Sequence, residues 1–230
     1  MLFYAPNLLQ ENILPEEESQ HAVKVLRLRA GDNVEIVDGK GTVCNARIIN
    51  PHAKHCEFEI ISQRITDQPN YNLHIAIAPT KNIERLEWFV EKVTEIGVGT
   101  ITPIICRFSE RKILKSERLE KIIVSASKQS LKTHFPVLQP LCSFEELIKA
   151  TSNIAQRFIA HCYEQDKLLL KDLCKPTMDT LILIGPEGDF SLEEVEKAIS
   201  AGFQPVSLGN SRLRTETAGI VACHTVALGN

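Results

Sequence analysis

From residue 73 onward, short apolar runs alternate with stretches in which apolar residues recur every three or four positions. The short runs predict buried strands, and the longer period predicts amphipathic helices. Strands are predicted at residues 73–78, 100–106, 158–161 and 181–184 and in the run ending at Leu208-Gly209; helices are predicted at 83–96, 116–126 and 215–228, after Ser143 and after Ser191. Repeated strand–helix units of this kind predict an α/β fold with a mainly parallel, covered sheet.

Several helix boundaries are marked by their own residues. Ser143 with Glu146, and Ser191 with Glu194, have the spacing of a capping box. Gly97 follows the helix predicted at 83–96, and Gly202 is expected to end the helix that starts at Ser191. Glycine favours such positions because it adopts the left-handed backbone that ends a helix.

The first 65 residues follow a different pattern, with short strands and tight turns. Strands are predicted at 33–37, 42–49 and 57–61, and Asp38-Gly39-Lys40-Gly41 forms a turn between the first two. This pattern indicates a small β-barrel. The polar segment 66–72 separates it from the strand–helix pattern. We therefore expect two domains, residues 1–68 and residues 72–230.

Two glycine-bearing strand ends in the second domain predict a ligand site. The run 181–184 stops at Gly185-Pro186-Glu187-Gly188, and a later run stops at Leu208-Gly209. Glycine lets the backbone approach a ligand where a Cβ would obstruct it. Loops at the carboxyl ends of neighbouring strands form a crevice in open α/β sheets, and ligands bind there.

Composition sets wider limits on the class of protein. Hydrophobic residues make up 43% of the chain and charged residues 24%, as in a soluble globular protein. No run approaches the roughly 20 apolar residues of a membrane span, and no signal peptide is evident, so we expect a cytoplasmic protein. The seven cysteines form no CxxC pair and are expected to be reduced. Cys44, His52, His55 and Cys56 match no common zinc spacing, so no metal is expected.

The net charge of −3 argues mildly against an RNA partner, because cations that neutralise phosphates supply much of the affinity for RNA. Local clusters of basic residues would have to perform that task. They are His21, Lys24, Arg27 and Arg29; Arg107, Arg111, Lys112, Lys115, Arg118 and Lys121; and Lys128, Lys132 and His134. A solvated surface is the simpler interpretation of any one cluster, and it weakens if all three converge.

The two glycine segments resemble paired motifs of the SPOUT methyltransferases, and more narrowly of the RsmE family of 16S ribosomal RNA uridine-N3 methyltransferases. The second segment continues as Leu213-Arg214-Thr215-Glu216-Thr217-Ala218. The resemblance implies that the two segments are loops of a deep trefoil knot, with S-adenosylmethionine bent between them. True knots are almost absent from proteins, so composition and periodicity alone do not suggest one.

The resemblance extends over nearly the whole chain. The matching segments are His21, Val25-Leu26-Arg27, Gly31-Asp32, Asp38-Gly39-Lys40-Gly41, the stretch from Lys92 to Val98, Ser109-Glu110-Arg111, Gln129-Ser130 and Pro136. It implies that the N-terminal domain is a PUA-like RNA-binding barrel and that the second is a SPOUT methyltransferase domain. Asp189 stands where the family usually has glycine, and Lys132 stands where it has arginine. Lysine keeps the charge but loses the guanidinium fork. Asp189 is expected to favour the positive helix terminus.

The resemblance also assigns roles to residues. Arg214, with Glu216 close by in sequence, is the first candidate to orient the uracil or remove its N3 proton. For the cofactor, apolar side chains would hold the adenine and backbone groups would supply hydrogen bonds. The cofactor residues are Pro79, Ile184, Gly185, Gly188, Leu208, Gly209 and Leu213; the RNA residues are His21, Lys24, Arg27, Arg111, Gln129, Lys132 and Arg212. In the competing interpretation, Arg212 and Arg214 only neutralise Glu187 and Glu216.

Two other classes of protein remain to be weighed. A Rossmann-type enzyme would need Gly97-Val98-Gly99 as its phosphate loop, but this triplet follows a predicted helix and precedes a strand, which is the wrong order. Two alternative functions remain: a non-catalytic RNA-binding assembly factor with the same fold, and a SPOUT enzyme that modifies another RNA. The family pairs through the knotted domain, so we expect a homodimer. Ile220, Val221, Thr225 and Leu228 lie among the small residues Ala218, Gly219, Ala222 and Ala227, which would allow close helix contact.

Overall fold

The computed structural model describes residues 2–230, which form two compact units. The first unit comprises the described residues up to Gln68 together with Ser127–Phe135, and the second comprises Pro69–Ala126 and Pro136–Asn230. The segment 127–135 therefore departs from the expected boundaries, which placed it in the second domain. Within the described residues, no helix is long and apolar enough to cross a membrane.

The first unit is built on a four-stranded sheet in the order β1-β2-β3-β4. The strands are β1 (Leu2–Tyr4), β2 (Asn33–Val37), β3 (Thr42–Asn50) and β4 (Glu57–Ile65), and β1 pairs with β2 in parallel whereas the other pairs are antiparallel. Helix α1 (Glu16–Gln20) and the π-helical turn η1 (His21–Val25), neither of which was predicted, precede β2. Phe3, Ile36 and Phe58 are fully buried in the core of this unit.

Backbone hydrogen bonds explain why residues 127–135 belong to the first unit. Gly41 N donates a hydrogen bond to Thr133 O at 3.0 Å, and Phe135 N donates one to Gly39 O at 2.9 Å. The ring of Phe135 stacks on Tyr4 at 4.9 Å between centroids. Gly41 is required here: its φ is +101°, and a Cβ would lie 2.5 Å from the His134 ring. The turn predicted at residues 38–41 is thus a docking point for a distant segment.

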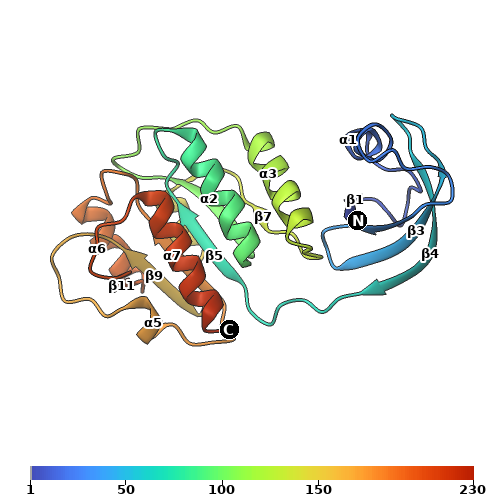
Figure 1. The fold of residues 1–230 in the computed structure, drawn as a ribbon. Coiled ribbons are helices and arrows are strands. Elements are labelled where there is room, and N and C mark those ends of the chain that lie inside the picture. The colour runs from blue at the N-terminus through green and yellow to red at the C-terminus, as the bar shows by residue number, and fades with distance from the viewer. Residues whose placement is uncertain (1) are drawn as a thin grey trace. The chain divides into compact units, whose positions relative to one another are not determined.

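The second unit contains a seven-stranded parallel sheet in the order β11-β9-β10-β5-β6-β7, with β8 also paired to β6 (Figure 1). Its strands are β5 (Leu73–Ile77), β6 (Thr100–Ile105), β7 (Val137–Leu138), β8 (Cys142–Ser143), β9 (Gln156–Ala160), β10 (Thr180–Ile184) and β11 (Gln204–Val206). All residues of β5 and β10 are buried, as expected for strands covered on both faces. The prediction of a mainly parallel α/β sheet is confirmed.

Helices cover both faces of this sheet. The helices are α2 (Ile83–Ile96), α3 (Ser116–Gln129), α4 (Phe144–Ala150), α5 (Leu170–Leu173), α6 (Leu192–Ser200) and α7 (Thr215–Leu228). Figure 1 shows α2 and α7 side by side across one face. Phe144 of α4 and Val195 of α6 pack with Leu181 and Leu183 of β10 in one core cluster. Both predicted capping boxes are present, and Gly97 and Gly202 have the expected left-handed backbone.

Close packing between α2 and α7 uses the small residues of α7. A Cβ on Gly219 would lie 2.4 Å from the Phe89 ring of α2 and 3.2 Å from Ile77. Ala222 is also fully buried. Gly219 therefore makes room for α2 of the same chain, which corrects the expectation that it serves contact with a partner subunit. Ile220, Val221 and Thr225 stay half-buried, and Leu228 is exposed.

Candidate functional site

Three loops leave the second unit at the same edge of the sheet. Ala160, the last residue of β9, pairs with Ile184 of β10 on one side and Val206 of β11 on the other. Because the strands are parallel, the segments 161–167, 185–190 and 207–214 all begin there. The structure therefore brings the two glycine segments to one edge, with the loop after β9 between them.

These loops and the first turns of α7 enclose a crevice with two lobes. One lobe has a volume of about 360 Å³ and the other about 290 Å³. Both are lined by Ala160, Cys162, Arg212, Leu213 and Ala218. The larger lobe extends along residues 206–211 and the smaller along Ile184, Gly185, Pro186 and Glu187. Cavities of this size suit a small-molecule ligand.

Five of the seven residues expected to bind a cofactor line this crevice. Ile184 and Gly185 line the smaller lobe, Leu208 and Gly209 line the larger one, and Leu213 lines both. Gly209 has a φ of +130°, and no heavy atom lies within 4 Å of where its Cβ would be. A side chain at Gly209 would therefore strain the backbone, although it would meet no protein atom.

Pro79 and Gly188 line neither lobe. Pro79 is buried directly after β5. Gly188 is exposed, and a Cβ there would lie 3.1 Å from the Phe108 side chain. Gly188 thus gives room to Phe108, whereas Gly185 gives room to the Phe190 ring and backbone, also at 3.1 Å.

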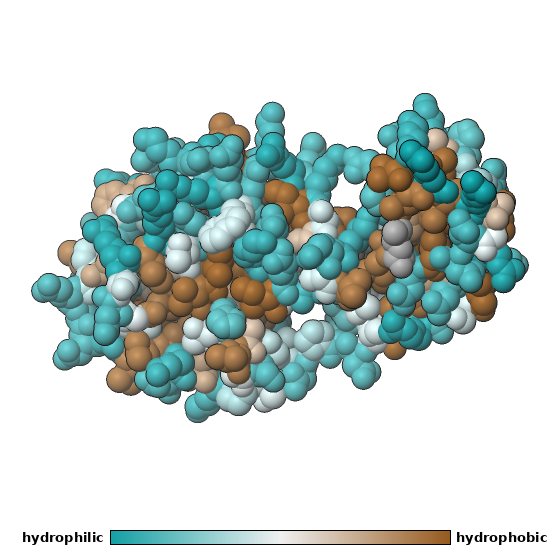
Figure 2. All heavy atoms as spheres, in the orientation of Figure 1, coloured by the Kyte–Doolittle hydropathy of each residue, from teal (hydrophilic) through white to brown (hydrophobic). Residues whose placement is uncertain are grey.

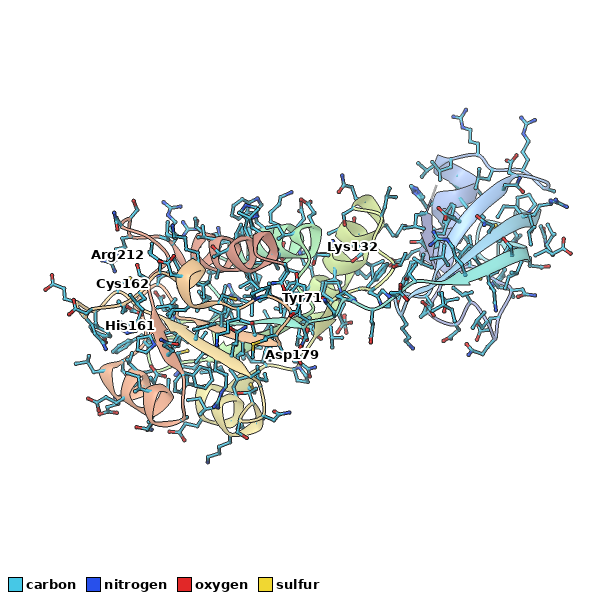
Figure 3. All side chains as sticks on the ribbon, turned by 90° about the horizontal axis from the view of Figure 1, so that it is seen from below. Tyr71, Lys132, His161, Cys162, Asp179 and Arg212 are labelled. Atoms are coloured by element: carbon cyan, nitrogen blue, oxygen red, sulfur yellow. The ribbon has the colours of Figure 1, made fainter. Side chains whose placement is uncertain are left out.

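The loop after β9 is a wall of the crevice that the sequence analysis did not include. His161, Cys162 and Lys167 line the larger lobe, and Figure 3 shows His161, Cys162 and Arg212 at one end of the unit. Lys167 Nζ donates to His161 O at 2.5 Å and to Tyr163 O at 2.9 Å. These two hydrogen bonds stabilise the conformation of the loop. Burial lowers the pKa of His161, and the Lys167 ammonium lowers it further.

Asp189 joins two of the walls. Its Oδ2 accepts a hydrogen bond from Cys162 N over 2.7 Å, and its Oδ1 accepts one from Phe190 N over 2.8 Å. Asp189 also lines the smaller lobe. Its φ is +66°, a conformation that suits glycine better than aspartate. The expectation that Asp189 only favours a helix terminus misses this contact with the loop after β9.

Arg214 and Glu216 do not form a pair. Arg214 is exposed and lines the smaller lobe, whereas Glu216 is only 5% exposed and lines neither lobe. Glu216 Oε1 lies 3.8 Å from Arg85 Nε, and Glu216 Oε2 has no hydrogen-bond partner in the part of the chain described. The side chains therefore have different surroundings: Arg214 faces the crevice and Glu216 faces Arg85.

The neutralising interpretation of the two arginines is wrong for this structure. Glu187 Oε1 accepts a hydrogen bond from Lys81 N over 3.0 Å. Over residues 2–230, no ion pair involves Arg212 or Arg214. Both arginines line the crevice, so their charge is available to an anionic ligand.

The residues expected to bind RNA fall into two groups. His21, Lys24, Arg27, Gln129 and Lys132 belong to the first unit, and all except the half-buried Lys132 are exposed. Arg111 and Arg212 belong to the second unit. Arg111 donates to Thr80 O over 3.1 Å and to Lys81 O over 2.7 Å, so it holds the loop after β5. No cluster of metal-binding side chains occurs among residues 2–230.

Comparisons with known proteins agree with this architecture. A family model described as "RNA methyltransferase domain" matches residues 66–227, and one described as "RNA methyltransferase PUA domain" matches residues 14–61. The Ribosomal RNA small subunit methyltransferase E of Buchnera aphidicola is 30% identical over 94% of this chain and 87% of its own length.

Solved structures of rRNA methyltransferases also resemble this chain. A probable rRNA-methyltransferase from Porphyromonas gingivalis matches with a TM-score of 0.94 and 46% identity, covering 99% of this chain and 97% of the other. A Ribosomal RNA small subunit methyltransferase E from Neisseria gonorrhoeae, bound to S-adenosyl methionine, matches with a TM-score of 0.80 and 30% identity, covering 96% and 94%.

Proposed function

This chain belongs to the RNA methyltransferase family, and from that premise we propose that it transfers the methyl group of S-adenosylmethionine to N3 of a uridine in 16S ribosomal RNA. The observation that carries the proposal is the two-lobed crevice at the ends of β9, β10 and β11. A cytoplasmic location follows from a ribosomal substrate and is part of the proposal.

The crevice has the chemistry that S-adenosylmethionine requires. Ile184, Leu208 and Leu213 offer apolar surface to the adenine, and Gly185 and Gly209 line the crevice, with open space beside Gly209. Bound S-adenosylmethionine would supply a sulfonium-activated methyl group. The leaving thioether is neutral, so the protein's main contribution is alignment of the uracil N3 with that methyl.

Ala218 offers a direct test of the cofactor site. It lies in the first turns of α7 and lines both lobes, so Ala218→Leu fills the crevice with a residue that helices accept readily. Calorimetric titration should show S-adenosylmethionine binding to the parent, and binding to Ala218→Leu weaker by at least about tenfold. Ala150→Leu, at the exposed end of α4, is the matched control. Equal affinity of parent and Ala218→Leu would place the cofactor elsewhere.

Arg214 is the side chain best placed to act on the uracil. It is exposed beside the smaller lobe, and a cation there favours the anion formed when the N3 proton leaves. The buried Glu216 lines neither lobe, so we assign it to holding Arg85 and the start of α7. Arg212 lines both lobes and remains a candidate for a phosphate contact.

Single-turnover transfer of labelled methyl tests this assignment. The substrate is small-subunit RNA, presented naked and as an assembled particle, and the product is identified by nucleoside analysis. We expect labelled 3-methyluridine, and we expect Arg214→Ala to lower the transfer rate by about a hundredfold with a smaller change in RNA affinity. Label on ribose, on guanine or on transfer RNA alone would refute the substrate while sparing the cofactor.

A non-catalytic assembly factor is the second candidate, because the first unit carries exposed cations that suit RNA without chemistry. That candidate predicts RNA binding by a parent protein that neither binds S-adenosylmethionine nor transfers methyl. The titration and the transfer assay therefore separate the two functions.

We further propose that the crevice loops form part of a trefoil knot and that the protein is a homodimer joined through α7. Ile220, Val221 and Thr225 are half-buried and Leu228 is 78% exposed, and Figure 2 shows apolar residues gathered around α7. Such a surface favours a partner helix. Sedimentation should give about twice the chain mass of 25.8 kDa, and a monomer at micromolar concentration would count against the dimer.

A further inference from the structure

We infer that Asp189 is a positioning residue for the cofactor, because it fixes the loop after β9 against the loop after β10. This inference rests on the proposed binding of S-adenosylmethionine in the crevice. In this inference, residues 161–163 form one wall of the cofactor site, and the Asp189 carboxylate determines where that wall lies.

The carboxylate spans two loops that are distant in sequence. Oδ2 accepts from Cys162 N at 2.7 Å and Oδ1 accepts from Phe190 N at 2.8 Å, so both oxygens are in use. A hydrogen bond from Tyr163 Oη to Phe190 O, at 2.7 Å, joins the same two loops. Hydrogen bonds to an ionised acceptor are about twice as strong as neutral ones. The link through Asp189 is therefore the stronger of the two.

The backbone at Asp189 has a conformation that favours glycine. At a φ of +66° a glycine would fit without a Cβ penalty, whereas aspartate is less favourable there. Lys167, by contrast, makes its contacts within its own loop: its Nζ donates to His161 O and Tyr163 O. Lys167 thus shapes the loop, and Asp189 holds it against its neighbour.

Cys162 makes this link relevant to the whole crevice. It follows His161 directly after β9 and lines both lobes. Without the Asp189 carboxylate, Cys162 N would lose its acceptor, and the loop would be held less firmly at the point shared by the two lobes. A cofactor that occupies both lobes would then have to order this loop on binding. The cost of ordering the loop lowers the affinity for the cofactor.

Asp189→Gly tests the carboxylate with little disturbance of the backbone, because glycine suits the left-handed conformation. We expect the affinity for S-adenosylmethionine to fall by about tenfold in calorimetric titration. Asp189→Asn keeps one oxygen acceptor and tolerates a positive φ, so it should lose less affinity than Asp189→Gly.

Asp179→Gly is the matched control. Asp179 Oδ1 also accepts from a backbone amide of another loop, Asn72 N, at 2.7 Å. Figure 3 shows Asp179 at the other end of the unit from Cys162. This variant removes the same charge and the same kind of contact, and it should bind S-adenosylmethionine like the parent.

The exposed thiol of Cys162 provides a readout independent of activity. Burial raises the pKa of this thiol, and the neighbouring Asp189 carboxylate raises it further. In Asp189→Gly, the pH profile of Cys162 alkylation, followed by peptide mass spectrometry, should shift to lower pH and show faster labelling. S-Adenosylmethionine should protect Cys162 in the parent, because the residue lines both lobes.

The outcomes separate the inference from the proposed function. A parent that does not bind S-adenosylmethionine refutes the function. A parent that binds, with Asp189→Gly equal to it in affinity, refutes the role of Asp189 alone, whether or not Cys162 labelling changes. Equal loss of affinity in Asp189→Gly and Asp179→Gly would also refute it, because the loss would then reflect charge or general stability.

Discussion

At the scale of single residues, burial decides the charge of His74. This histidine lies on β5, is 7% exposed, and its Nε2 is 2.7 Å from Thr102 Oγ1 on β6. Burial lowers the pKa of His74 to about 4, from an ordinary value of 6.5. The folded protein therefore holds a neutral imidazole where the unfolded chain would already be protonated.

We predict that this histidine makes the protein sensitive to acid. Its folded pKa lies below the unfolded one, so the unfolded state binds more protons between pH 6.5 and about 4, and the free energy of unfolding falls as pH falls through that window. Between about pH 7 and pH 5, His74 should account for about 2 kcal/mol of this loss. Urea unfolding at both pH values should show a correspondingly smaller loss in His74→Gln.

His224→Gln is the control, because His224 is exposed on α7. It should lose the same free energy of unfolding as the parent between the two pH values. A pH dependence in His74→Gln as steep as that of the parent would contradict the assignment to His74.

Some residues that line the crevice could be predicted from the sequence, because they follow the end of an apolar run. Gly185 and Gly209 each follow an apolar run, so their place at a sheet edge could be predicted. His161 ends a predicted strand and Cys162 follows it, so that signal was available. Their place between the other two loops depends on β9 lying between β10 and β11, which chain order does not reveal.

At the scale of elements, Glu194 serves two structures at once. Its Oε2 accepts from Ser191 N over 2.8 Å and completes the capping box of α6. Its Oε1 accepts from Arg107 N over 2.8 Å, which holds the loop after β6. The start of one helix is thereby tied to the end of a distant strand.

We predict that Glu194→Ala destabilises the protein more than Ser191→Ala. Loss of the Ser191 cap should cost about 1 kcal/mol of unfolding free energy. Glu194→Ala also leaves Arg107 N without its acceptor, so its cost should exceed that of Ser191→Ala by about 1 kcal/mol or more. Urea unfolding at neutral pH measures both values.

Ser143→Ala removes the same kind of cap from α4 and is the comparison for Ser191→Ala. If Glu194→Ala costs no more than Ser191→Ala, the contact with Arg107 N contributes nothing to stability.

Long elements were predictable and short ones were not. Both α2, which has a clear periodic pattern, and α7 were predicted with the bounds that the structure has. The two-residue strands β7 and β8 and the short helices α1 and α5 were missed, because tertiary contacts rather than local pattern define elements of that length. The docking of residues 127–135 on the turn at Gly39 and Gly41 is likewise a long-range contact.

At the scale of the whole molecule, a net charge of −3 has to be reconciled with an RNA substrate. The first unit exposes His21, Lys24 and Arg27 close together in sequence, around the π-helical turn η1. Arg27 has a φ of +56°, which is uncommon for a residue with a side chain. A local concentration of cations can bind phosphates even when the total charge is negative.

We predict that the double variant Lys24→Ala/Arg27→Ala binds ribosomal RNA more weakly and with a flatter dependence on salt. The slope of log affinity against log salt should fall by up to about one unit for each phosphate that the variant no longer neutralises. Affinity for S-adenosylmethionine should not change, because neither residue lines the crevice. Filter binding across a salt series provides the measurement.

Arg47→Ala/Lys54→Ala removes the same charge from exposed positions of the same unit and is the control. An equal loss of RNA affinity in both double variants would mean that total charge, rather than the segment around η1, determines binding.

The crevice depends on the pairing of β5 with β10, which attaches its strands to the rest of the sheet. Asn72 and Asp179, which flank the two strands, are 107 residues apart, and β9 and β11 are joined to β5 through β10. Pairings between such distant segments form slowly, because a long loop must close first. During synthesis, the crevice therefore stays incomplete until residues 206–218, which line much of its larger lobe, have been added to the chain.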